Sequence, residues 1–203
     1  MKAIALATLT VLLLGARAHA VDGLAAHKPQ PDMFGDRALF SPLIGDWKIE
    51  SVVYSSDGTQ LNQSGDWNFG WILDGRAVQD VLVIPGARAG KAEARPVTHG
   101  TSIRAYDPDI AAWRATYVDP VRNVTLSQVT RQENDRIVQE GVNGEGVMTR
   151  WVFSDIRRDA FTWRAESSGD HGKTWKVDQE IRAVRKTHED PPHWRVRMGQ
   201  GPW

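Results

Sequence analysis

The sequence contains no cysteine, carries no net charge and has no apolar run long enough to cross a membrane comfortably. Its 25 Lys and Arg balance 25 Asp and Glu. Without cysteine the chain forms neither disulfides nor thiolate metal sites, so packing alone must stabilise it. A balanced charge provides no field to attract nucleic acid or an anionic membrane. Beyond the N-terminus no stretch approaches the ~20 apolar residues of a membrane helix.

The N-terminus has the three parts of a secretory signal. After Lys2 an apolar run extends to Leu14, and Ala18-His19-Ala20 is a small-residue cleavage site. We therefore expect a signal peptide over residues 1–20, a mature chain that begins at Val21, and export to the periplasm or the extracellular space. An uncleaved signal anchor is the competing interpretation.

Strand-length runs separated by turn residues fill most of the chain. The ten runs are residues 47–56, 61–73, 76–84, 100–106, 112–118, 121–131, 136–142, 147–156, 161–166 and 175–183. Their connections are mostly short, so consecutive strands should pair antiparallel, and closure would remove the sheet edges. The sequence predicts an all-β fold, a single up-and-down antiparallel β-barrel of about ten strands. A two-sheet sandwich is the alternative.

The chain divides into four segments. After the signal, residues 21–41 form a lead-in whose apolar spacing over 31–41 predicts a short helix that could plug one end of the barrel. The barrel domain should occupy residues 42–185. Residues 186–203 are polar and rich in helix and strand breakers, which predicts a flexible C-terminal tail.

The last two runs have the pattern of a hairpin with one apolar face. Its odd-numbered apolar residues are Phe161, Trp163, Ala165, Trp175, Val177, Ile181 and Ala183. The predicted register sets charges opposite one another outside, in the pairs Arg164–Asp178 and Glu166–Lys176, and sets Phe161 opposite Ile181 inside. Trp163 and Trp175 should both face the core, with Gln179 opposite Trp163. The turn, Ser168-Gly169-Asp170-His171-Gly172-Lys173-Thr174-Trp175, resembles the Asp-box of sialidases, a structural motif; one copy does not predict a propeller.

Several stretches carry a family resemblance. Gly45-Asp46-Trp47 resembles the Gly-x-Trp signature in the first strand of lipocalins and other calycins. Residues 67–81, 103–108, 151–156 and 161–167 resemble the exported, lipocalin-like proteins of the DUF1579 type. The likeness runs from about Gly45 to Arg185 and implies a lipocalin- or calycin-like barrel. It implies no activity, because that family has no settled reaction to carry over.

Two hairpin registers predict a buried ion pair. A two-residue turn at Asp74-Gly75 pairs Phe69 with Asp80, which places a carboxylate on the apolar face. A buried carboxylate must find a partner or keep its proton. In the next hairpin, a register that pairs Arg104 with Trp113 and Tyr106 with Ala111 points Arg104 inward, whereas a register one residue longer would set it against Arg114. We therefore expect Asp80 and Arg104 to pair inside.

Nine Trp residues suggest a ring-rich interior or ligand pocket. The candidate ligand-binding residues are Trp67, Trp71, Asp80, Arg104, Tyr106, Trp113, Tyr117, Trp163 and Gln179. Catalytic residues cannot be assigned from the sequence, although Asp80, Arg104 and Tyr106 are candidates. The polar members of this set could instead form an internal hydrogen-bond network whose only role is to fix the register of the strands.

Three functions remain open at this point. The first is an exported barrel that binds a small apolar or aromatic ligand in a Trp-lined cavity, oriented by Asp80 and Arg104. The second is a lyase or hydrolase in which Asp80 or Tyr106 acts as general acid–base and Arg104 holds an anionic substrate. The third is a solidly packed barrel that acts through its surface or its C-terminal tail. Fold does not choose between them.

We expect a small-molecule ligand, no nucleic acid, no membrane contact after signal cleavage, and a monomer or dimer. No cofactor or metal is expected, because no phosphate-binding loop, catalytic elbow or ordered His cluster occurs. His188 and His193 lie in the tail without a third ligand. His99, near the longest loop, is more typical of a surface histidine than of a haem or metal ligand.

Overall fold

The computed structural model describes residues 24–86 and 96–187. Two short 3-10 helices lie near the start of this part of the chain, η1 (Gly35–Ala38) and η2 (Ser41–Leu43). The strands are β1 (Ala25–Ala26), β2 (Gly45–Tyr54), β3 (Gln60–Ile72), β4 (Ala77–Pro85), β5 (Pro96–Asp107), β6 (Ala112–Asp119), β7 (Val124–Glu133), β8 (Arg136–Val142), β9 (Met148–Ser154), β10 (Ala160–Ser168) and β11 (Lys176–Arg185).

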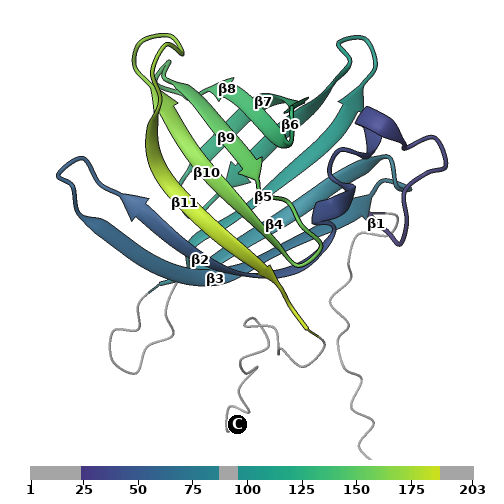
Figure 1. Cartoon of the computed structure of the whole chain (residues 1–203), viewed down its shortest axis with the longest axis horizontal. Helices are drawn as coiled ribbons and strands as arrows, with labels where there is room; N and C mark the ends of the chain where they lie inside the picture. The colour runs from purple at the N-terminus through teal and green to yellow at the C-terminus, as the bar shows by residue number, and fades with distance from the viewer. Residues whose placement is uncertain (1–23, 87–95, 188–203) are drawn as a thin grey trace, which may run out of the picture.

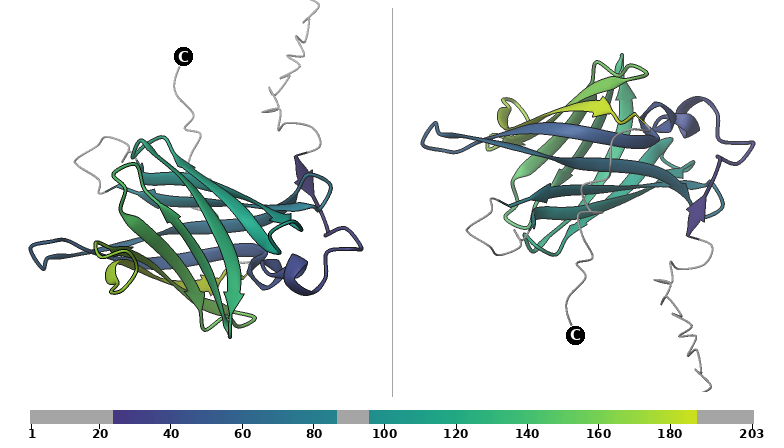
Figure 2. Two further views of the ribbon diagram at one scale, coloured as in Figure 1. Left: turned by 90° about the horizontal axis from the view of Figure 1, so that it is seen from above. Right: turned by 90° about the horizontal axis from the view of Figure 1, so that it is seen from below.

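Strands β2 to β11 close into one barrel (Figures 1 and 2). Each strand pairs antiparallel with its neighbours in the chain, and β11 pairs with β2 to complete the circle. The two-residue β1 adds to β3 outside this circle. The predicted up-and-down barrel of ten strands is therefore confirmed, and the sandwich alternative is wrong.

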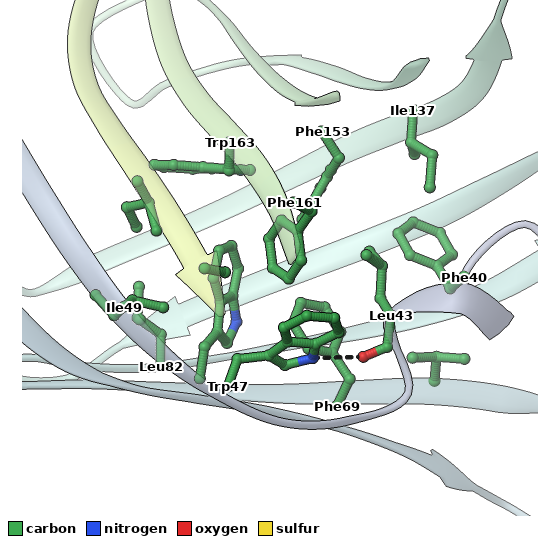
Figure 3. Packing of buried hydrophobic residues seen from close by; sticks show 14 of the residues in the cluster. Phe40, Leu43, Trp47, Ile49, Phe69, Leu82, Ile137, Phe153, Phe161 and Trp163 are labelled. Carbon is green, nitrogen blue, oxygen red and sulfur yellow. Dashed lines mark hydrogen bonds between the residues drawn. The ribbon is translucent and has the colours of Figure 1, made fainter. Parts of the chain in front are cut away.

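The N-terminal segment covers one end of the barrel, which we call the closed end (Figure 1). The sequence predicts one short helix here, and the structure forms two 3-10 turns, the second with Pro42 in its first turn. The side chains of Phe40 and Leu43 insert fully into the core. The indole Nε1 of Trp47 donates a hydrogen bond of 2.8 Å to the carbonyl oxygen of Leu43, which ties the segment to β2 (Figure 3).

Aromatic rings fill the closed half of the barrel (Figure 3). Phe40 meets the indole of Trp113 edge-on at 5.2 Å between ring centroids, and Trp47 meets Phe161 at 4.7 Å. Such edge-to-face contacts add to the free energy gained from burying the rings. The opposite end of the barrel, where the β2–β3, β6–β7 and β10–β11 turns lie, we call the open end.

The register of β3 and β4 matches the prediction. Phe69 stands opposite Asp80 and Trp71 opposite Val78. Three consecutive turn residues have positive φ, Leu73 at 50°, Asp74 at 57° and Gly75 at 78°. Left-handed backbone at an Asp-Gly pair is the conformation that a tight hairpin requires. Asp80 therefore lies inside the barrel.

The register of β5 and β6 differs from the prediction by two residues. Arg104 stands opposite Ala115 and Tyr106 opposite Trp113. The strands continue pairing as far as Asp107 opposite Ala112, and Ala111 adopts a positive φ of 47° in the turn that joins them. A shift of two residues keeps every side chain on its face. Arg104 consequently points inward as predicted, although its expected neighbour was wrong.

The register of β10 and β11 is also different, and here the error changes which face some residues occupy. Phe161 stands opposite Ala183 and Trp163 opposite Ile181. Between Ala165 and Glu166 the partner advances from Gln179 to Val177, so β11 bulges at Asp178. A bulge of one residue reverses the alternation beyond it. Trp163 is buried as predicted.

Trp175 lies on the far side of that bulge, and its predicted place inside is wrong. Its ring is half-buried and stacks on the guanidinium of Arg150 at 4.1 Å. Arg150 in turn pairs with Glu166 on the neighbouring strand, with an Nε–Oε2 distance of 2.7 Å. Glu166 therefore does not pair with Lys176. Arg164 is exposed as predicted, but its partner is Glu180, at 2.9 Å, and not Asp178.

The turn at residues 169–175 has Asp-box geometry. Asp170 accepts hydrogen bonds from the backbone N–H of Thr174 at 2.8 Å and from its hydroxyl at 2.6 Å, and Ser168 Oγ accepts one from the N–H of Gly172 at 2.8 Å. These bonds to Thr174 lower the pKa of Asp170 to about 2. The motif closes the β10–β11 hairpin at the open end.

Two expectations fall outside the described residues: the signal peptide over residues 1–20 and most of the tail over residues 186–203. Within residues 24–86 and 96–187, neither 3-10 turn has the length or the apolar character of a membrane-spanning helix.

Candidate binding cavity

A cavity of about 420 Å³ occupies the open half of the barrel. Its apolar lining includes Val53, Leu61, Trp67, Leu82, Val97, Val124, Leu126, Trp151, Trp163 and Ala165, and its polar lining includes Tyr54, Gln63, Asp80, Thr98, Ser102, Tyr117, Arg122, Asp178 and Gln179. Its volume lies in the range of ~300–1,000 Å³ that is usual for small-molecule pockets. Strand alternation aims most of these side chains inward, although three consecutive pairs also line the cavity: Val53 and Tyr54, Val97 and Thr98, and Asp178 and Gln179.

Four rings form one continuous wall of the cavity. The ring of Tyr117 meets that of Trp151 at 5.0 Å, Trp151 meets Trp163 at 5.5 Å, and Trp163 meets Trp67 at 5.7 Å. All three contacts are edge-on, so each ring holds its neighbour in one orientation. The result is a preorganised aromatic surface from β3, β6, β9 and β10.

Three polar side chains face the cavity from neighbouring strands. Asp80 on β4 stands opposite Ser102 on β5, and Ser102 stands opposite Tyr117 on β6. We call these three residues the polar row. Asp80 is 2% exposed and Ser102 1%, so this row is shielded from bulk water. A carboxylate, a hydroxyl and a phenol therefore lie side by side.

Gly100 makes room for the phenol of the polar row. A Cβ atom at this position would collide with the hydroxyl end of the Tyr117 ring. The absence of a side chain on β5 therefore lets the ring lie against that strand.

Tyr117 stays protonated at ordinary pH. Burial raises its pKa, and the nearby Asp119 carboxylate raises it further. The phenol donates a hydrogen bond of 3.2 Å to Oδ2 of Asp119, whose Oδ1 accepts the backbone N–H groups of Val121 and Arg122. Because its proton is directed at Asp119, the Tyr117 oxygen is left as an acceptor.

The ion pair that the sequence predicts forms beneath the polar row. Arg104 Nη1 donates to Oδ2 of Asp80, and the two side chains are 0% and 2% exposed. Arg104 lies opposite Val78 and Ala115, two residues nearer the closed end than Ser102. Asp80 lines the cavity, whereas Arg104 does not.

A hydrogen-bond network holds the buried guanidinium. Arg104 Nε donates to Gln139 Oε1 at 2.9 Å, and Gln139 Nε2 donates to Gln128 Oε1 at 2.7 Å. The Phe40 ring packs against the guanidinium at 4.8 Å. Nη2 has no hydrogen-bond partner among the described residues. This network closes the floor of the cavity and compensates the Arg104 charge.

The structure brings together part of the predicted set. Five of the nine candidates line the cavity: Trp67, Asp80, Tyr117, Trp163 and Gln179. Of the other four, Arg104 is the floor cation and Trp71 is a core residue near β1. Tyr106 and Trp113 line a separate cavity of about 140 Å³ at the closed end. Of the two alternative acid–base candidates, Asp80 lines the open-half cavity and Tyr106 does not.

Sequence reasoning missed several cavity residues. Trp151 completes the aromatic wall, Ser102 completes the polar row, and Tyr54 donates to Glu180 at 2.6 Å near the open end. Two signals in the sequence could have found the first two. Trp151 and Phe153 lie two residues apart on one strand and so share a face, and Ser102 lies two residues before the inward Arg104.

The described residues hold no cluster of three or more His, Asp or Glu side chains suited to a metal ion. His99 is exposed and stands opposite Val83.

No protein-family model and no curated protein sequence matches this chain. Among solved structures it is similar to the crystal structure of Rv2717c from M. tuberculosis, with a TM-score of 0.55 and 13% sequence identity. The match covers 79% of this chain and 100% of that one. At this identity the likeness shows a shared barrel fold. The resemblance to the DUF1579 type stays a prediction.

Proposed function

We propose that this protein is an exported binding protein that holds a small apolar or aromatic ligand in the open-half cavity. The observation that carries the proposal is a cavity of about 420 Å³ with three indoles in its wall, those of Trp67, Trp151 and Trp163. Ligand pockets combine such apolar walls with a few placed polar groups, and the polar row supplies these. The closed half of the barrel is packed with aromatic rings. This core supports the cavity walls, so the cavity can keep its shape without a ligand.

Export is supported by the Ala18-His19-Ala20 cleavage site. We expect the intact mass of the exported protein to correspond to a chain that begins at Val21. A mass that retains residues 1–20 would contradict export with cleavage.

The proposal is limited to binding. Arg104 has no exposed surface with which to hold an anionic substrate, and its Nη1 is engaged by Asp80. Tyr106 lines the other cavity. Of the two candidate acid–base residues, only Asp80 lines the open-half cavity, and its Oδ2 accepts a hydrogen bond from Arg104.

Binding can be tested by filling the cavity. Ala165 lines it, whereas Ala105 is exposed on the outer face of β5. We expect N-phenyl-1-naphthylamine to bind the wild-type protein with increased fluorescence, and the Ala165→Trp variant to lose at least about tenfold in affinity because the new indole occupies the cavity. Ala105→Trp, the matched control, should bind as the wild type does.

Equal binding by wild type and the Ala165→Trp variant would show that the dye sits elsewhere and would overturn the proposal. Native mass spectrometry of the purified protein then identifies any ligand that the cavity retains.

A further inference from the structure

The polar row and the indoles of the aromatic wall differ in chemistry, and they meet where the Tyr117 ring contacts that of Trp151. Asp80, Ser102 and Tyr117 project from the adjacent strands β4, β5 and β6. The indoles of Trp151 and Trp163 project from β9 and β10, which lie five strands away from β4 and β5 around the ten-stranded circle. A flat molecule in this space would lay its face against the indoles and turn an edge toward the polar row.

The polar row offers mainly hydrogen-bond acceptors. Asp80 presents a carboxylate, and the Tyr117 oxygen accepts because its own proton is directed at Asp119. Ser102 can donate or accept. Two carboxylates, those of Asp80 and Asp119, therefore flank the hydroxyl of Ser102 and the phenol of Tyr117.

The cation that balances the Asp80 charge, Arg104, lies on the floor side of Asp80 and does not line the cavity. It is therefore not placed to contact an anionic ligand. Arg104 is 0% exposed and reaches Asp80 from the floor. A ligand carboxylate at the row would meet the Asp80 carboxylate before it met the guanidinium. Arg122 lines the cavity too, but it follows β6 at the open end and not in the row.

We infer that the ligand is an aromatic molecule that presents an O–H or N–H donor to the polar row, and that the row rejects aromatic carboxylates. The inference rests on the proposed function, since it names the ligand class of the same cavity. A donor that reaches Asp80 makes a charge-assisted hydrogen bond, which strengthens binding roughly tenfold or more. A buried carboxylate facing Asp80 would be repelled.

Three probes with the same ring system separate the possibilities. 2-Naphthol carries the donor, 2-methoxynaphthalene replaces it with a methyl ether, and 2-naphthoate carries the anion. Their affinities can be measured at pH 7 by isothermal titration calorimetry. We expect 2-naphthol to bind about tenfold or more tightly than the ether, and 2-naphthoate to bind more weakly than either.

Variants of the row assign the preference to these side chains. Ser102→Ala leaves the buried ion pair intact, and we expect it to weaken 2-naphthol about threefold to tenfold while leaving the ether unchanged. Ser127→Ala is the matched control, because Ser127 is exposed on the outer face of β7. Asp80→Asn should remove the discrimination against 2-naphthoate. If that variant does not fold, the Ser102→Ala comparison stands without it.

The outcomes separate this inference from the proposed function. Equal affinities for all three probes, or tightest binding of 2-naphthoate, would overturn the donor assignment while the cavity remained a binding site. A Ser102→Ala variant that weakens 2-naphthol and the ether alike would also overturn it, because a structural disturbance affects both. Failure of every probe to bind would remove the proposed function as well.

Discussion

The two halves of the barrel are built from the same strands but are filled differently. In the closed half, Phe40 and Leu43 enter from the N-terminal segment. They pack against Trp113 and Trp47, and all four side chains are buried. In the open half no described segment enters, and the rings of Trp151 and Trp163 line a cavity. The comparison shows that strand alternation supplies the inward-facing side chains in both halves. Whether the interior is filled depends on the N-terminal segment, which lies outside the barrel strands.

The same contrast applies to charge. The Asp80–Arg104 pair is inside and desolvated, whereas the Arg164–Glu180 pair crosses the outer surface with side chains 53% and 36% exposed. Desolvation makes an interior partner hard to remove, and water largely screens a surface pair. The following measurements test both contrasts, from the largest expected effect to the smallest.

Removing one member of the interior pair should have the largest effect. We expect Arg104→Met or Asp80→Leu alone to lower the free energy of unfolding by ~3–5 kcal/mol, since each leaves an unpaired buried charge, and the double variant to recover much of that loss. Urea denaturation of the four proteins gives the coupling energy. Additive effects, with coupling below ~0.5 kcal/mol, would contradict an interior pair.

Truncating a ring of the closed half should cost slightly less. We expect Phe40→Ala to lower the free energy of unfolding by about 3 kcal/mol, because it leaves a cavity among packed rings. Leu61→Ala at the cavity mouth is the comparison, and because Leu61 is 55% exposed we expect a change within ~0.5 kcal/mol. Similar losses at both positions would mean that the two halves are equally packed.

The exterior pair should contribute little. We expect Arg164→Ala to change the free energy of unfolding by less than ~1 kcal/mol, and the change to shrink in high salt. Thermal unfolding in low and high salt measures both. A loss as large as that of Arg104→Met would erase the distinction between the inner and outer faces.

The Asp-box turn at the open end should have the smallest effect, and only in acid. The pKa of Asp170 falls from its ordinary 3.8 to about 2 in the folded protein, so the charged turn stabilises the fold fully above pH 3.8 and loses this contribution as pH drops through about 2. We expect Asp170→Asn to be less sensitive than wild type to acid between these values. Parallel acid dependence of unfolding in the two proteins would contradict the assignment.

For most residues of the strands, the face that they occupy follows from the sequence alone. Alternation with a period of two assigns faces, and a pairing error of two residues preserves the assignment. Arg104 was therefore placed inside correctly although its predicted neighbour on β6 was wrong. The Asp74-Gly75 turn went further and fixed the β3–β4 register, because a short turn leaves the strands little freedom in how they pair.

Two features do not follow from the alternation of residues along a strand: where a bulge reverses the faces, and which inward residues lie near one another. The bulge at Asp178 reverses the face of Trp175, because the β11 strand must meet both the Asp-box turn and the β2 register at its other edge. Closure also decided which inward residues share a space. Tyr106 and Asp80 both point inside, but Tyr106 lines the small cavity at the closed end and Asp80 lines the open-half cavity. The position of an inward-facing residue along the barrel axis depends on the stagger of all ten strands together. The register of a single hairpin therefore does not predict it.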